Sequence, residues 1–230
     1  MQIDIITLFP DIFFGPFSES IIGRAIDREI VKINSVNLRN YTCDKRCTVD
    51  DTPYGGGPGM LMKAEPVFKA VEDLKNSDTY VVLTSPQGEK YNQSIAEELI
   101  EKKHLLIVCG HYEGVDERIR SNLIDREISI GDYILTSGNL PAMVIVDSIV
   151  RLLPGVLGDD NSSKDESFSN GLLEYPQYTK PADYKGMKVP DVLLSGNHGL
   201  IREWKKEQAI CRTKSRRPDL YEKFIEKNRN

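Results

Sequence analysis

The sequence contains no long apolar run and few of the residues that mark secreted proteins. Its four cysteines are scattered among 230 residues, and we expect them to be reduced structural thiols. No apolar stretch approaches the roughly 20 residues that span a bilayer. The first residues, Met1 to Asp4, lack the basic start and apolar core of a secretory signal. We therefore expect a cytoplasmic protein without membrane contact.

Familiar metal and nucleotide motifs are also missing. Cys43 and Cys47 are close in sequence, but no second pair completes the ligand set of a structural zinc site, so we expect no metal. The glycine-rich segment from Asp50 to Met60 is followed by no Gly-Lys-Ser/Thr and lacks the third glycine of a dinucleotide fingerprint. Its two prolines predict a mobile but shaped loop, either a lid over a base or an ordinary surface loop.

The charge is unevenly distributed along the chain. The net charge is −5, which argues against an RNA partner. Residues 199–230, however, hold ten Lys or Arg against five Asp or Glu. A basic segment on an acidic body suits a nucleic-acid-binding arm, and a solvated helical face accounts for the charge equally well.

The spacing of apolar residues predicts an α/β fold. Strands and helices that alternate along a chain form a largely parallel sheet, which on base rates is doubly wound and free of knots. The predicted strands are 3–8, 31–38, 79–83, 105–108 and 128–130, and the predicted helices are 18–30, 65–74, 94–103, 115–123 and 140–153.

Three of the predicted strands run into glycine-bearing loops at 84–88, 109–114 and 131–141. In α/β folds such loops gather at the carboxyl edge of the sheet, where ligands bind. Glycine lets backbone groups approach a ligand closely. Singly, each loop is typical of a tight strand-to-helix connection, but together they predict a pocket walled largely by backbone.

The chain changes character at residues 155–171, a polar and aperiodic stretch with the composition of a linker. Helical spacing returns after Gly199, and Pro218 separates a last helix. We expect an α/β domain over 1–157, a flexible linker over 158–171 and a small, basic, all-α domain over 172–230.

Several long strings carry a family resemblance. They read VDDTPYGGGPGMLM at 49–62, SPQG at 85–88, GHYEGVDERI at 110–119, SIGDYIL at 129–135, LPAM at 140–143, DSIVRLLPGVLG at 147–158 and VPDVLLSGNH at 189–198. In this order they resemble the bacterial tRNA (guanine-N1)-methyltransferases of the SPOUT class, over nearly the whole chain. The resemblance implies a deep trefoil knot in the α/β domain, S-adenosylmethionine as methyl donor, tRNA as substrate, and a homodimer in which the linker of one subunit closes the pocket of the other.

The resemblance assigns the three glycine-bearing loops to the cofactor. Adenine would contact backbone groups and apolar side chains, and Glu113 would pair with the ammonium group of the methionine part. A carboxylate that stabilises the start of a helix is the alternative role for Glu113. The family commonly has two glycines where this chain has Ser137-Gly138, which bears on loop flexibility. The implied set is Ser85, Pro86, Gln87, Gly110, Tyr112, Glu113, Gly114, Ile130, Gly131, Asp132, Tyr133, Ile134, Leu135, Gly138 and Pro141.

Methylation of guanine N1 also needs a base, which the resemblance places in the linker. The family uses the aspartate of an Asp-Ser-Phe string, and here an Asp-Glu-Ser-Phe string begins at Asp165. Ungapped counting from Gly158 puts Glu166 at the family position, whereas Asp165 serves only after a small shift. Arg151 matches a family arginine thought to favour the deprotonated base, and an ordinary arginine at a helix end is the alternative.

The implied RNA contacts lie in the glycine-rich loop and in the C-terminal helices. Guanine would be flipped out of its stack to reach the pocket, and the expected target is the guanosine just 3′ of the anticodon. A SPOUT ribose 2′-O-methyltransferase and a non-catalytic RNA-binding protein of the same fold remain as alternatives. The implied residues are Gly57, Gly59, Arg212, Lys214, Arg216 and Arg217.

Overall fold

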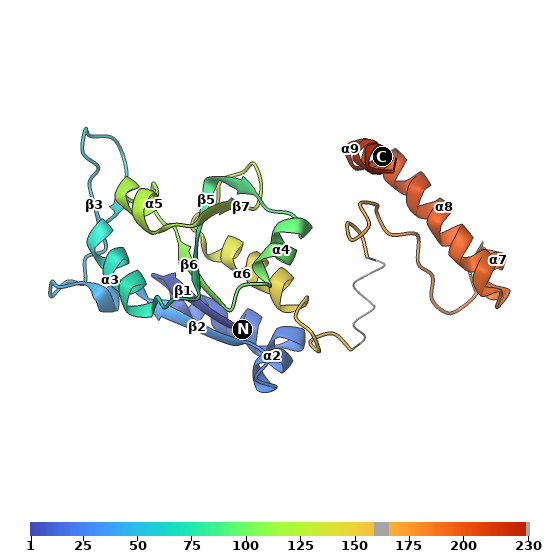
Figure 1. The fold of residues 1–230 in the computed structure, drawn as a ribbon, viewed down its shortest axis with the longest axis horizontal. Coiled ribbons are helices and arrows are strands. Elements are labelled where there is room, and N and C mark those ends of the chain that lie inside the picture. The colour runs from blue at the N-terminus through green and yellow to red at the C-terminus, as the bar shows by residue number, and fades with distance from the viewer. Residues whose placement is uncertain (159–165, 229–230) are drawn as a thin grey trace. The chain divides into compact units, whose positions relative to one another are not determined.

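The computed structural model describes residues 1–158 and 166–228 and divides into two compact units, Met1–Gly158 and Asp159–Asn230. The first unit contains the sheet and the helices that pack on it, and the second carries the helices of the C-terminal segment (Figure 1). Within the described part of the chain, every helix is too short or too polar to cross a bilayer.

The first unit is built on a five-stranded sheet in the order β2-β1-β6-β5-β7. Every neighbouring pair in this sheet is parallel, which confirms the predicted parallel α/β architecture. The strands are β1 (Gln2–Thr7), β2 (Lys32–Asn37), β5 (Thr79–Lys90), β6 (His104–Cys109) and β7 (Arg126–Ser129).

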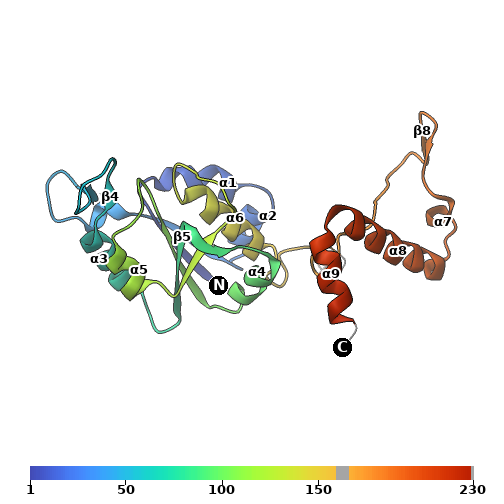
Figure 2. The same cartoon turned by 90° about the horizontal axis from the view of Figure 1, so that it is seen from above.

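Helices cover both faces of the sheet because the central strands are apolar on both sides. In β6, Leu105 and Ile107 belong to one buried cluster, whereas Leu106 and Val108 belong to the other, as the period of two along a strand requires. The sheet therefore lies between two helical layers (Figure 2). Residues of α1 (Phe14–Ser18), α2 (Ser20–Asp27), α4 (Gln93–Leu99) and α6 (Asn139–Val150) pack in the first cluster, and residues of α3 (Ala64–Leu74) and α5 (Glu117–Leu123) pack in the second.

One polar network is buried near the amino-terminal edge of the sheet. The side chains of Asp4 and His104 are 2% and 4% exposed, and Asp4 Oδ2 lies 2.8 Å from His104 Nε2. Asn34 Nδ2 donates to Asp4 Oδ1 at 2.6 Å, and His104 Nδ1 lies 2.7 Å from Thr79 Oγ1. The network joins β2, β1, β6 and β5. Because removing one member of a buried pair is costly, it stabilises the register of these strands.

Two segments are more structured than the sequence predicts. β5 continues past the predicted end at residue 83: its pairing with β7 shifts register after Thr84 and resumes at Glu89. The stretch 39–62, which shows no periodicity, contains part of a 3-10 helix, η2 (Leu38–Tyr41), and the antiparallel pair β3 (Asp50–Asp51) and β4 (Leu61–Met62). A second 3-10 helix, η1 (Pro10–Phe13), precedes α1.

The second unit is helical but not all-α. It contains α7 (Asp191–Leu194), α8 (His198–Arg216) and α9 (Pro218–Lys227), together with a short hairpin of β8 (Asp183–Tyr184) and β9 (Met187–Lys188). Asn197 caps α8 by accepting from two backbone N–H groups. The segment before the hairpin docks on α8 through Leu173 N, which donates to the buried Thr213 Oγ1 at 2.8 Å.

Candidate functional site

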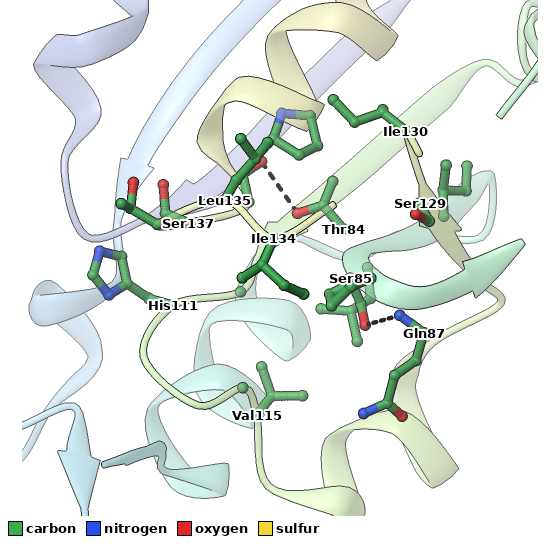
Figure 3. Close-up of a pocket in the computed structure, with 18 of the residues that line it drawn as sticks. Thr84, Ser85, Gln87, His111, Val115, Ser129, Ile130, Ile134, Leu135 and Ser137 are labelled. Atoms are coloured by element: carbon green, nitrogen blue, oxygen red, sulfur yellow. Dashed lines mark hydrogen bonds between the residues drawn. The ribbon is translucent and has the colours of Figure 1, made fainter. Parts of the chain in front are cut away.

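The predicted loop at 84–88 is instead part of β5, where the pairing with β7 shifts register. This segment and the loops after β6 and β7 meet at the carboxyl edge of the sheet and line one cavity of about 340 Å³. Gly138 N donates to Gly110 O at 2.7 Å, which joins the loop after β7 to the loop after β6. His111 and Ser137 form an antiparallel bridge beside this bond. Ser85, from β5, lies across the cavity from them (Figure 3). We call this cavity the strand-end pocket.

Thr84 of β5 holds these three segments together at the floor of the strand-end pocket. Its side chain is buried, and Oγ1 donates toward Val108 O and Gly138 O, each at 3.2 Å. Figure 3 shows the second of these contacts as a dashed line from Thr84. A Cβ at Gly138 would overlap Thr84 Oγ1 and lie only 2.8 Å from Gly110 N. The loops therefore approach this closely because position 138 carries no side chain.

The start of α6 is anchored beside the pocket by a buried pair. Thr7 Oγ1, at the end of β1, donates to Asn139 Oδ1 at 2.8 Å. Asn139 is the first residue of α6, directly after Gly138. Thus β1 contributes to the position of the loop even though it does not line the pocket.

The predicted cofactor residues converge on this cavity, with one exception. Fourteen of the fifteen line it, whereas Asp132 does not, because its carboxylate is exposed and lies 3.3 Å from Lys90 Nζ. Nine further residues line the pocket that were not among the fifteen: Leu83, Thr84, Val115 and Ile128 are strand-end or buried positions, and His111, Arg120, Ser129, Thr136 and Ser137 are polar. Thr84, His111, Thr136 and Ser137 lie inside the three glycine-bearing ranges, so that signal could have included them. Arg120 lies on α5, and its approach to the cavity has no local signal in the sequence.

Tyr112 is held by its neighbour in an unusual conformation. Its φ is +58°, and its backbone N–H donates to His111 Nδ1 at 2.9 Å. Burial lowers the pKa of His111 below the usual 6.5, which favours the neutral ring that can accept this bond. Burial also raises the pKa of the nearby Cys109 thiol, so this cysteine stays protonated and does not act as a nucleophile.

The glycine-rich segment forms a hairpin that is attached to the edge of the pocket. Its stem is the β3–β4 pair, and Met62 N donates to Gly114 O at 3.0 Å while Glu113 N donates to Met60 O at 3.0 Å. A Cβ at Gly59 would overlap the Glu113 side chain. The sequence predicts a shaped loop here, and the backbone bonds to the loop after β6 place it next to a lining residue.

The predicted catalytic residues fall in different parts of the molecule. Arg151 follows α6 in the first unit, where its backbone N–H donates to Asp147 O at 3.3 Å. Glu166 belongs to the second unit and lines a hollow there with Tyr175 and Lys205. Asp165 lies outside the described residues. The catalytic roles of Arg151 and of a linker carboxylate therefore stay predictions.

The four basic residues predicted to contact RNA in and after α8 differ in the contacts that their side chains make within the protein. Arg212 donates to Glu174 O at 3.4 Å, and Arg217 forms a two-point contact with Asp219 at 2.6 and 2.9 Å. Lys214 lies over the ring of Tyr221, and both Lys214 and Arg216 are exposed. Lys214 and Arg216 are therefore more accessible to a phosphate than Arg212 and Arg217. In the hairpin loop, Gly57 faces open space.

Comparison with known proteins agrees with this geometry. A family model described as tRNA (guanine-1)-methyltransferase TrmD matches residues 1–223. The chain belongs to this family. Relatives named tRNA (guanine-N(1)-)-methyltransferase are 60% identical in Dictyoglomus turgidum, 58% in Bacillus pumilus and 55% in Staphylococcus haemolyticus. The matches cover 97%, 96% and 97% of this chain and 91%, 91% and 92% of the respective relatives. The family resemblance that the sequence strings indicated is thereby confirmed over residues 1–223 of this chain.

Proposed function

We propose that the chain transfers a methyl group from S-adenosylmethionine to N1 of the guanosine just 3′ of the anticodon of tRNA. Membership of the tRNA (guanine-1)-methyltransferase family carries the reaction class. The observation that carries the site is the strand-end pocket, which gathers fourteen of the fifteen expected cofactor residues in one cavity of about 340 Å³. This volume lies within the roughly 300–1,000 Å³ of small-molecule sites.

The lining of the pocket suits a nucleoside attached to an amino acid. Ile130, Leu135 and Pro141 offer apolar contacts for an adenine ring, and backbone groups near Gly110 and Gly138 offer hydrogen bonds. Glu113 lines the same cavity and is the carboxylate for the methionine ammonium. The sulfonium of the cofactor supplies a methyl group that is already activated, so no metal or covalent nucleophile is required of the protein.

The protein itself must then align the reactants and remove a proton. Holding the two reactants in line is worth about 7–11 kcal/mol at best, and a positioned base contributes about 10²–10⁴-fold. Glu166 is the base in this proposal, with Asp165 as the alternative. Arg151 favours the deprotonated guanine by its positive charge.

The parts of the chain have separate roles in this proposal. Residues 1–157 carry out methyl transfer, residues 158–171 form an interdomain linker, and residues 172–230 bind tRNA, in the cytoplasm. The hairpin loop with Gly57 and Gly59 would contact the flipped base. Exposed Lys214 and Arg216, with Arg212 and Arg217, would meet phosphates.

The active enzyme is a homodimer in this proposal, with the linker of one subunit closing the pocket of the other. Leu140 and Val144, one turn apart on α6, are 49% and 45% exposed although apolar. Exposed apolar side chains on one helix face favour a protein interface. The helix begins beside the pocket, because Pro141 in its first turn lines the cavity.

The proposal includes the trefoil knot that the resemblance implies. Membership of the family carries this part of the proposal. The segments that the knot would involve lie in close contact, since Gly88 of β5 packs against its neighbour β7 at Glu127 and Ile128, and Gly138 packs against Gly110.

The test is methyl transfer from labelled cofactor to unmodified tRNA transcripts, with the target guanosine present or replaced. Labelling should occur only when it is present, and digestion should yield N1-methylguanosine. Equal labelling of both transcripts would refute the position. A 2′-O-methylated nucleoside would refute the base as target. No transfer, together with no binding of S-adenosylhomocysteine in calorimetry, would favour a non-catalytic RNA-binding protein.

A further inference from the structure

Arg120 is an unassigned arginine at the wall of the strand-end pocket. It lies on α5, and its side chain is only 15% exposed. Its Nη1 donates to Gln87 Oε1 at 2.6 Å and lies 3.0 Å from Glu127 Oε1. Its Nε lies 3.8 Å from Glu117 Oε2. The guanidinium therefore connects α5 to Glu127 of β7 and to Gln87, which lies in β5 at the register shift.

This contact decides which way the Gln87 amide points. A guanidinium can only donate hydrogen bonds, whereas a glutamine amide has an oxygen that accepts and a nitrogen that donates. With the oxygen turned to Arg120, the nitrogen must face elsewhere, and it lies on the side of Val115 (Figure 3). The backbone of the same residue is also held, because Gln87 N donates to Ser85 Oγ at 3.1 Å.

The charges around Arg120 suit a site for a cationic ligand. Glu127 and Glu117 both lie within 4 Å of the guanidinium, so the arginine adds little net positive charge to the wall. A sulfonium would otherwise be repelled by a nearby cation. Arg120 can thus orient a neighbour at small electrostatic cost to the ligand.

We propose that Arg120 is a positioning residue that fixes the side-chain amide of Gln87 as a hydrogen-bond donor to the ligand of the strand-end pocket. The ligand group it serves is a neutral or anionic acceptor, such as a ribose hydroxyl, a ring nitrogen of a purine or a carboxylate. This inference rests on the proposed function, because the expected ligand is S-adenosylmethionine or its product S-adenosylhomocysteine.

A double-mutant cycle on the full chain tests the inference, with S-adenosylhomocysteine as the probe in calorimetry. All variants carry Glu127→Gln, because the partly buried Glu127 carboxylate, 23% exposed, would otherwise lose its charged partner in Arg120→Met. Arg120→Met and Gln87→Leu should each weaken binding by about 3- to 10-fold, the range of one net hydrogen bond. The double variant should be no weaker than Gln87→Leu alone, because Arg120 acts through Gln87. Arg118→Met is the matched control: it changes an exposed arginine of the same helix that pairs with Asp116, and it should bind as the parent does.

The outcomes separate this inference from the proposed function. Absence of binding by the wild-type chain would refute the cofactor assignment and the inference together. Wild-type binding with no loss in Arg120→Met, or a loss that adds fully to that of Gln87→Leu, would overturn the inference alone. If Arg120→Met does not fold, Gln87→Glu decides: its carboxylate still accepts from Arg120 but cannot donate, so affinity equal to that of the parent would overturn the proposal.

Discussion

Replacing Gly138 by alanine should damage the strand-end pocket more than its size suggests. The added methyl would overlap Thr84 Oγ1 and press on the backbone of Gly110. Thr84 cannot move freely, because its hydroxyl is buried and bonded to Val108 O and Gly138 O. The loop after β7 must therefore lift away from the loop after β6.

The magnitude follows from the contacts that would be lost. Overpacking a tight site costs about 1–3 kcal/mol, and a buried hydrogen-bonding group left without its partner costs about 1–3 kcal/mol. Since lifting the loop relieves only part of the first cost and adds the second, we expect a total of about 2–4 kcal/mol. A domain of this size loses about 2–4 °C in Tm for each kcal/mol. Affinity for S-adenosylhomocysteine should fall at least about tenfold, because each 1.4 kcal/mol is a factor of ten.

The assay is calorimetric titration with S-adenosylhomocysteine together with thermal unfolding. Gly15→Ala is the matched control, because a Cβ there would meet nothing within 4 Å and Gly15 does not line the pocket. Thr84→Ala combined with Gly138→Ala removes the first overlap but not the backbone one, so it should recover part of the affinity. Wild-type Tm and affinity in Gly138→Ala would refute the close approach of the loops. A lower Tm with unchanged affinity would refute the pocket as the cofactor site.

Three further predictions concern the base, the buried network and pH. Glu166→Ala should cut turnover at least about 100-fold with cofactor affinity nearly unchanged, and a more severe Asp165→Ala would move the base by one residue. His104→Leu removes one polar partner of the buried Asp4 carboxylate, which keeps its hydrogen bonds from Asn34 and Gln2, so denaturant unfolding should show a loss of about 1–3 kcal/mol; a loss within about 0.5 kcal/mol of zero would contradict the network's role. Burial holds the pKa of His111 below 6.5. Above that pKa the neutral ring accepts the hydrogen bond from Tyr112 N through Nδ1, and as pH falls through the pKa the ring is protonated and the bond is lost. Cofactor affinity, measured from neutral pH to well below 6.5, should therefore fall in the wild type but not in His111→Phe.

The sequence by itself determined the sheet and the edge on which the pocket lies. Apolar residues on both faces of the strand at 105–108 require helices on both sides, and the structure places two buried clusters there. Parallel strands bring their carboxyl ends to one edge. Loops that follow such strands must share that edge, which explains why Ser85, Gly110 and Gly131 line one cavity.

The tertiary structure decided the contacts between segments that are distant in the chain. The overlap that excludes a side chain at Gly138 depends on Thr84, which is 54 residues away, and Arg120 meets Gln87 across 33 residues. No local sequence pattern predicts the β8–β9 hairpin of the second unit. The same holds for the hydrogen bond from Met62 N to Gly114 O that attaches the glycine-rich loop. The periodicity of a sequence reports which face of an element is buried, because burial acts on each residue separately. It does not report which two loops touch, because that depends on the path of the chain between them.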